Sequence, residues 1–216
     1  MGQGNKITRG SNAYPYVSIT GPVGSGKTTL TARLAQELAW TPLFESPNNN
    51  PFLADYYAGV PHCAYLAQAW FQMETLTHLH RISTMQGRYV VERDLNERHE
   101  VFITPLEQSG AITRIEGHTL ELMRTSASRI ARPASLMITL HCPEAVLLRR
   151  VRERGHEYER KLDEAWFASH VARYEAFWSR TTIPRLSVNS AQSSFGEQSM
   201  IAELAMRVRK HLATGL

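Results

Sequence analysis

The sequence predicts an α/β fold in which a five-stranded parallel sheet carries helices on both faces. Five short apolar runs recur along the 216 residues, and segments with helical patterning separate them. Apolar residues make up 43 % of the chain and charged residues 20 %, which excludes disordered and collagen-like classes. Alternation of strands and helices is typical of a layered α/β domain.

The strand assignments rest on continuous apolar character rather than on alternation. A strand that is buried on both faces of a parallel sheet reads as an unbroken run of apolar residues. We expect strands at residues 16–20, 41–45, 89–92, 136–141 and 186–188. In such sheets ligands bind beyond the carboxyl ends of the strands, so functional residues are sought there.

Helical patterns fill the intervals between these runs. Leu30, Leu34 and Leu38 repeat every four residues after the first strand and mark one helix face. The segment 63–85 is rich in helix formers, and Pro143 suits the start of a helix. Further helices are expected at 112–130, where Gly117 weakens the pattern, at 167–178 and at 201–212.

The chain shows no internal repeat and no linker that would divide it. We expect one domain over residues 14–216, preceded by a flexible polar arm at 1–13 that lacks the apolar core of a secretory signal. The longest apolar stretch, near 136–140, is too short to cross a membrane. Cys63 and Cys142 form no CxxC pair, which argues against a disulfide framework or a cysteine zinc site and favours the cytoplasm.

The charge balance is mildly basic. Lys and Arg number 24 against 20 Asp and Glu, giving a formal charge of +4. This excess suits a protein that handles phosphates, but it is too small to indicate stable nucleic-acid binding, and no nucleic-acid-binding motif is present.

The strongest motif stands at the end of the first expected strand. Residues 21–28 read GPVGSGKT and match the phosphate-binding pattern GxxxxGK[ST], with a strand before and a helix after. In this motif backbone N–H groups surround the phosphates at a helix N-terminus, a lysine reaches the β and γ phosphates, and a hydroxyl ligates Mg²⁺. The pattern predicts a P-loop fold that binds ATP and Mg²⁺, through Gly21, Gly24, Ser25, Gly26, Lys27, Thr28 and Thr29.

Charged residues close the second and third expected strands. Glu45 ends the second, and Glu92 with Arg93 ends the third. A single glutamate after a strand is commonly a solvated charge, but two carboxylates and an arginine beside a phosphate loop favour catalysis. We expect Glu92 to help hold Mg²⁺, Glu45 to take a proton from a substrate hydroxyl, and Arg93 to neutralise charge on the transferred group.

A third cluster is rich in arginine and precedes Gly155. Arg150 and Arg154 are four residues apart on an expected helix, so two like charges share one face. An anion between them would remove the repulsion, as in a lid that closes over phosphates. A solvated basic face is an equally good interpretation of this segment by itself.

Together these pieces resemble the deoxynucleoside kinase family, which includes deoxycytidine, deoxyguanosine and deoxyadenosine kinases. The matching runs span residues 16 to about 178, roughly three quarters of the chain. The phosphate loop alone is common to many kinases, whereas the ordered set is more specific. The runs are GPVGSGKTTL, FES, NPFLADYY, YLAQAWF, VVERD and RVRERGHEYE.

The resemblance implies roles for individual residues. Glu45 matches the base that deprotonates the sugar 5′-hydroxyl, and Glu92 and Arg93 match the family's Glu-Arg-Ser motif, with Asp94 in place of serine. The resemblance also implies roles for residues of the sugar, base and lid sites, which by residue type alone fit ordinary packing or polar positions as well. The resemblance implies 3′-hydroxyl contacts by Tyr57 and Glu159, base recognition by Gln68 and Phe102, and phosphate contacts by the lid residues Arg150 and Arg154, with His156 replacing a further arginine.

Two departures bear on the choice of nucleoside. Many members carry arginine seven residues after the base-reading glutamine and aspartate six residues after the strand-end glutamate; this chain has Thr75 and Arg98. Arg98 is then a candidate to supply the cation from the other side of the base. The preferred nucleoside is left open.

The expected reaction is ATP-dependent phosphorylation of a deoxyribonucleoside 5′-hydroxyl. The alternatives are a nucleoside monophosphate kinase, a kinase acting on a modified nucleotide in DNA, a GTP-binding switch, and a non-catalytic subunit. The switch is disfavoured because no Asn-Lys-x-Asp motif is present. The resemblance also implies a homodimer built from the helices at 63–85 and 112–130, with small-molecule substrates and no membrane partner.

Overall fold

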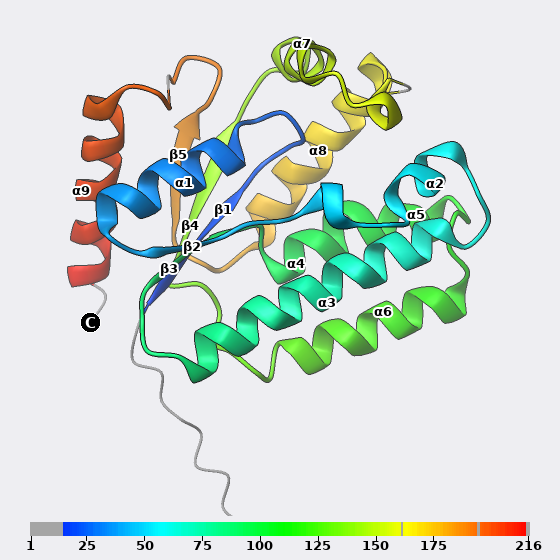
Figure 1. Cartoon of the computed structure of the whole chain (residues 1–216), viewed down its shortest axis with the longest axis horizontal. Coiled ribbons are helices and arrows are strands. Elements are labelled where there is room, and N and C mark those ends of the chain that lie inside the picture. The colour runs from blue at the N-terminus through cyan, green and yellow to red at the C-terminus, as the bar shows by residue number, and fades with distance from the viewer. Residues whose placement is uncertain (1–14, 161, 194, 215–216) are drawn as a thin grey trace, which may run out of the picture.

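The computed structural model describes residues 15–160, 162–193 and 195–214, so the polar arm expected at 1–13 lies outside the described residues. Five strands form one parallel sheet, as predicted, and the structure places them in the order β2-β3-β1-β4-β5 (Figure 1). Their bounds are β1 Tyr16–Thr20, β2 Thr41–Leu43, β3 Tyr89–Glu92, β4 Leu136–His141 and β5 Arg185–Asn189.

Helices cover both faces of the sheet (Figure 1). One face packs against α1 and α9, through a core that includes Leu34 and Ile138. The other face packs against α3 and α8, where Tyr174 and Trp178 lie beneath the sheet. The long helices are α1 Lys27–Leu38, α3 Cys63–Thr84, α6 Arg114–Ala127, α7 Glu144–Arg154, α8 Glu164–Arg180 and α9 Gln198–Thr214.

Short helical segments connect these elements around the carboxyl ends of the strands. They are η1 Pro47–Asn49, α2 Leu53–Ala58, α4 Leu95–Glu97, η2 Arg98–Ile103, α5 Thr104–Gln108 and η3 Glu157–Glu159. The segment η2 is a π-helix and joins α4 to α5 without a break. Pro105 explains this widening, because it has no N–H to donate to the carbonyl four residues earlier. The sequence patterns did not predict these short segments.

The strand boundaries differ from expectation at the two edges of the sheet. The second strand was expected at 41–45 but ends at Leu43, so Glu45 lies in the following loop. The chain leaves the sheet there, and the Ser46 N–H donates to Glu74 instead of to a strand. The last strand is longer than the expected 186–188, because Arg185 and Asn189 also pair with β4.

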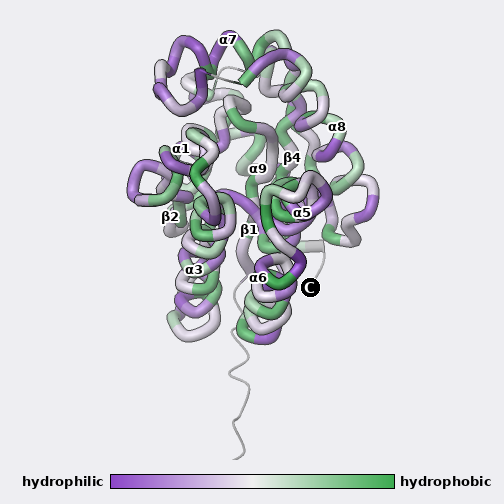
Figure 2. Tube along the Cα trace, turned by 90° about the vertical axis from the view of Figure 1, so that its right-hand side faces the viewer, coloured by the Kyte–Doolittle hydropathy of each residue, from purple (hydrophilic) through white to green (hydrophobic). Residues whose placement is uncertain are grey.

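Gly117 does not interrupt α6, although it weakens the sequence pattern. A Cβ placed there would lie 2.9 Å from the carboxyl carbon of Glu107 in α5, so the glycine makes room for that side chain. The helices α3 and α6 run side by side (Figure 2). Among the described residues, none of the helices is both long enough and apolar enough to span a membrane.

The core packing is tested by shortening one buried side chain. Ile138 lies in central strand β4 and is 0 % exposed. We expect Ile138→Ala to lower the free energy of unfolding by about 2–5 kcal/mol, because it removes buried methyl groups and leaves a cavity. Met206 in α9 is 61 % exposed, and Met206→Ala is expected to change stability by no more than about 0.5 kcal/mol. Equal losses for both variants in urea unfolding would contradict this core assignment.

Candidate active site

The phosphate loop joins β1 to α1 and is shaped by two glycines with left-handed backbones. Gly24 has φ 84° and Gly26 has φ 91°, which side chains rarely adopt, and a Cβ on Gly26 would lie 2.8 Å from the Phe195 ring. The Lys27 ammonium donates to the carbonyls of Gly21 and Pro22, at 2.8 and 2.9 Å. Burial lowers the pKa of Lys27 to about 8, with the positive charge of Arg93 adding to the effect.

The two residues expected to hold Mg²⁺ are in direct contact. The Thr28 hydroxyl donates to both carboxylate oxygens of Glu92, at 2.9 and 3.1 Å. Burial raises the pKa of Glu92 above its ordinary value. No group of three His, Cys, Asp or Glu able to hold a metal occurs among the described residues. The Thr28 hydroxyl and the Glu92 carboxylate are oxygen ligands of the kind that Mg²⁺ prefers. Mg²⁺ takes few protein ligands and completes its coordination shell with water and phosphate oxygens.

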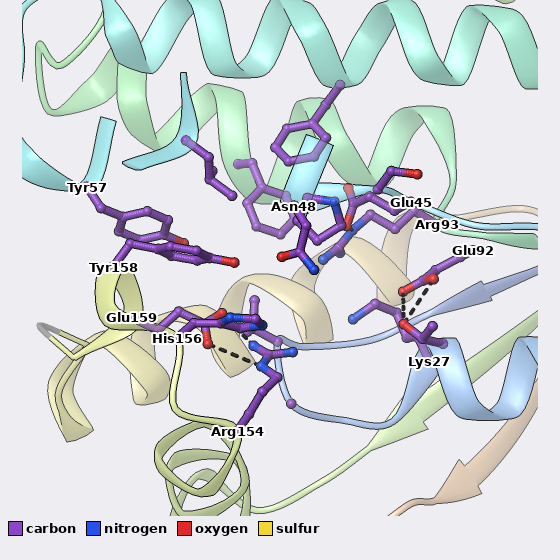
Figure 3. A pocket seen from close by; sticks show the side chains of 18 of the residues that line it. Lys27, Glu45, Asn48, Tyr57, Glu92, Arg93, Arg154, His156, Tyr158 and Glu159 are labelled. Atoms are coloured by element: carbon purple, nitrogen blue, oxygen red, sulfur yellow. Dashed lines mark hydrogen bonds and ion pairs between the residues drawn. The ribbon is translucent and has the colours of Figure 1, made fainter. Parts of the chain in front are cut away.

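Glu45 lies in the same cavity as the phosphate loop, beside Arg93 (Figure 3). Two arginines hold its carboxylate. The Arg93 Nε donates to one carboxylate oxygen at 2.6 Å, and Arg98 Nη2 donates to the other. Burial by itself would raise the pKa of this carboxyl, but the two guanidinium charges outweigh it and lower the pKa to about 2. Glu45 is therefore ionised at neutral pH and oriented by both ion pairs.

Arg93 is held by an unusual backbone and by three side-chain contacts. Its φ of 74° is left-handed, which is rare for a residue with a Cβ and typical of functional sites. Its N–H donates to the Ile19 carbonyl at 2.9 Å and so continues the β1–β3 ladder. Besides Glu45, the guanidinium donates to Glu97 and to the Tyr174 hydroxyl, both at 2.7 Å.

Asp94 caps the helix that follows Arg93. Its carboxylate accepts from the Asn96 N–H at 2.9 Å, and Glu97 accepts from the Asp94 N–H in a capping box. Asp94 is buried, and burial raises the pKa of its carboxyl from 3.8 to about 6. The acidic residue that replaces the serine of the family motif therefore has a structural role at this position.

The lid arginines reach the cavity, but they face different partners. Arg150 donates to the Ser190 carbonyl at 2.8 Å, whereas Arg154 donates to Glu159 at 2.5 and 3.2 Å (Figure 3). The carbonyl satisfies the Arg150 guanidinium, and the carboxylate neutralises that of Arg154. The two arginines were expected to share one anion, but in this structure each has its own protein acceptor.

Aromatic rings line the end of the cavity away from the phosphate loop. Tyr57 in α2 stacks on Tyr158 in η3, with ring centres 5.3 Å apart, and His156 stacks on the other side of Tyr158 at 5.2 Å (Figure 3). Gln68 in α3 lies at the cavity wall with Phe102, whose ring lies 4.8 Å from the Arg93 guanidinium carbon.

These groups surround one cavity of about 670 Å³. It brings together all the site residues predicted from the sequence except Gly21 and Ser25, which are buried in the loop and do not line the cavity. The sequence analysis missed several residues of the site. The only signal that could have indicated them is that most lie within a few sequence positions of a predicted residue. These are Asn48, Tyr56, Phe71, Tyr158 and Trp166 in the wall, and Glu97 and Tyr174 beside Arg93.

Comparisons with known proteins agree with this geometry. A family model described as deoxynucleoside kinase matches residues 17–212. A deoxyguanosine kinase of Lactobacillus acidophilus is 28 % identical over 148 residues, which are 66 % of this chain but only 64 % of that protein. A deoxyadenosine/deoxycytidine kinase of Bacillus subtilis is 25 % identical over 161 residues, covering 74 % of each chain.

A solved structure is also similar. The deoxyadenosine kinase from M. mycoides with bound dCTP superposes with a TM-score of 0.75 over 90 % of this chain and 98 % of that one. Its sequence identity is 18 %, so this likeness bears on the fold alone.

Asp94→Ser is expected to stabilise the protein at pH 7 by up to about 3 kcal/mol and to have a much smaller effect at pH 4. Between pH 3.8 and about 6 the folded protein keeps a proton that the unfolded chain has released, so stability falls as the pH rises through this interval. Serine keeps the cap acceptor but does not titrate.

The measurement is urea unfolding of both proteins at pH 4, 5.5 and 7. Asp163 also caps a helix, α8, but is exposed, so Asp163→Ser is the control that removes a cap carboxylate without relieving burial. A stability difference between Asp94→Ser and the original chain that is the same at all three pH values would contradict the burial argument.

Proposed function

The chain belongs to the deoxynucleoside kinase family and is a kinase of deoxynucleosides, and from that premise we propose the role of each residue in transferring the γ-phosphoryl group of ATP to the 5′-hydroxyl. The observation that carries the proposal is the placement of an ionised carboxylate, Glu45, in one cavity with the phosphate loop. An alcohol acceptor needs a base, and the loop supplies the phosphate site.

ATP is proposed to bind with its phosphates along residues 21–29. The N-terminus of α1 and the loop N–H groups favour anions there, and Lys27 exchanges its two carbonyl partners for phosphate oxygens. Thr28 and Glu92 would hold Mg²⁺, which neutralises charge on the β and γ phosphates when bound. The hydroxyl–carboxylate contact between them supports this pairing.

Glu45 is proposed to accept the proton of the 5′-hydroxyl as its oxygen attacks the γ-phosphorus. The new O–P bond forms as the bond to the ADP oxygen breaks, and the proton ends on the carboxylate. Because the pKa of Glu45 is low, its carboxyl is ionised at neutral pH. The hydrogen bonds from Arg93 and Arg98 orient the carboxylate. We propose that four cations lining the cavity stabilise the charge of the phosphoryl group: Lys27, Arg93, Arg150 and Arg154.

The deoxynucleoside is proposed to occupy the aromatic end of the same cavity. Tyr57 and Glu159 would hydrogen-bond the 3′-hydroxyl, while Gln68 would meet the base edge and Phe102 would pack beside the base. All four line the cavity, and an amide offers both a donor and an acceptor to a base.

The proposal extends to assembly and compartment. Helices α3 and α6 would form a homodimer interface, because they lie side by side and expose Met73, Ile115 and Leu122. The two cysteines are free and buried, which fits a protein of the reducing cytoplasm.

We expect Glu45→Gln to lower kcat on deoxynucleosides by about 10²–10⁴-fold, because the amide cannot accept the hydroxyl proton. ATP affinity, measured by calorimetry, should stay nearly unchanged. Glu74 lies close by and accepts from the Ser46 N–H but does not line the cavity, so Glu74→Gln is the matched control and should retain most activity. Phosphorylation of nucleoside monophosphates but of no nucleoside would contradict the assigned reaction.

ATP affinity is expected to fall as the pH rises above about 8. The ammonium of Lys27 must be protonated to bind phosphate, and burial lowers its pKa to about 8 in the ligand-free protein. The loss should approach about tenfold per pH unit. Titration calorimetry from pH 7 to 9.5 measures it. Lys27→Met should bind ATP weakly and without this dependence; an equally steep decline in the variant would assign the effect to another group.

A further inference from the structure

Two buried polar groups in the wall of the cavity have unused hydrogen-bonding capacity. Gln68 is 3 % exposed, and its Oε1 accepts from none of the described residues. Arg98 is also 3 % exposed, and its Nε donates to no described acceptor. Both residues line the cavity. Because a buried polar atom without a partner costs free energy, a ligand that satisfies both groups is favoured.

The guanidinium of Arg98 is held in place from two sides. It lies over the ring of Phe71, with its central carbon 4.5 Å from the ring centre, and its Nη2 donates to Glu45. Phe71 follows Gln68 by three residues on α3, so the two side chains are neighbours on that helix. Arg98 comes from the π-helix η2 and lines the cavity. It contacts Glu45, the proposed proton acceptor, and Phe71, the helix neighbour of the proposed base-reading residue Gln68.

The chemistry of these two groups is unequal. A guanidinium only donates hydrogen bonds, whereas an amide donates and accepts. The selection requires the exocyclic group of the base to face Arg98 and the ring nitrogen to face Gln68. In that orientation an oxo group beside a ring N–H offers an acceptor to Arg98 and a donor to Gln68 Oε1. An amino group in the same place presents a hydrogen-bond donor to the guanidinium, which itself only donates, so this contact is lost.

The other charged groups of the cavity do not offset this asymmetry. The carboxylates that line it among the described residues each already accept hydrogen bonds: Glu45 from Arg93 and Arg98, Glu92 from Thr28, and Glu159 from Arg154. An exocyclic amino group would have to compete with these protein donors for a carboxylate oxygen.

We propose that Arg98 is a specificity-determining residue that makes the enzyme prefer oxo bases, namely 6-oxopurine or 4-oxopyrimidine deoxynucleosides, over their amino counterparts. The inference rests on the proposed function, because it assumes that a deoxynucleoside binds in the cavity. It assigns to one donor-only side chain the choice between substrates that differ in a single exocyclic group.

The test compares substrates that differ only at that group: deoxyinosine with deoxyadenosine, and deoxyuridine with deoxycytidine. In whichever pair is phosphorylated, kcat/KM should favour the oxo member by roughly tenfold or more, as for one charge-assisted hydrogen bond. Arg98→Met should reduce this ratio by roughly tenfold. The variant also removes a cation from Glu45, but that change affects both members of a pair alike, so the ratio isolates base selection.

Two further variants complete the experiment. Thr75 is one turn along α3 from Phe71, donates to the Phe71 carbonyl and does not line the cavity, so Thr75→Val should keep the original ratio. Arg98→Lys keeps the charge but loses the planar donor set, and it should also lower the ratio if Arg98→Met fails to fold.

The outcomes are distinguishable. A ratio near one or in favour of the amino member in the original enzyme, or an unchanged ratio in both Arg98 variants, would overturn the base selection and leave the kinase assignment intact. Failure to phosphorylate any of the four nucleosides would instead overturn the proposed function, and the base selection with it.

Discussion

The Arg93 guanidinium donates hydrogen bonds to Glu45, Glu97 and Tyr174, which come from three separate parts of the chain. This contact set holds a left-handed backbone that costs of order 1–3 kcal/mol by itself. It also places two carboxylates around one buried cation, where the loss of a charged partner leaves a charge less well compensated. The position of Glu45, and so the proposed chemistry, depends on this one guanidinium.

The sheet order explains why these groups meet. β1 lies between β3 and β4 in the sheet. The phosphate loop after β1 and the charged residues at the end of β3 therefore lie next to each other at the carboxyl ends of the strands. The hydrogen bond from the Arg93 N–H to Ile19 extends that pairing by one residue. The cavity opens where connections depart toward opposite sides of the sheet, which is where ligands bind in open parallel sheets.

Each cation of the cavity already has a partner in the ligand-free protein. Lys27 is bonded to loop carbonyls, Arg150 to the Ser190 carbonyl, and Arg154 to Glu159. Nucleotide binding in this arrangement exchanges one acceptor for another and avoids exposing isolated buried charge. A lid that releases protein acceptors to gain phosphate oxygens can close without a large change in its electrostatic energy.

Local sequence determined the sheet, the long helices and the phosphate loop, because burial pattern and backbone requirements act over a few residues. Glycines at positions 24 and 26 and the motif around Lys27 are examples, and Glu92 is identified by its place at a strand end. Contacts between distant segments were decided only by the tertiary structure. The pairing of Arg98 with Glu45, the stack of Tyr57 on Tyr158 and the early end of β2 each depend on packing between elements far apart in the chain, and no periodicity records such packing.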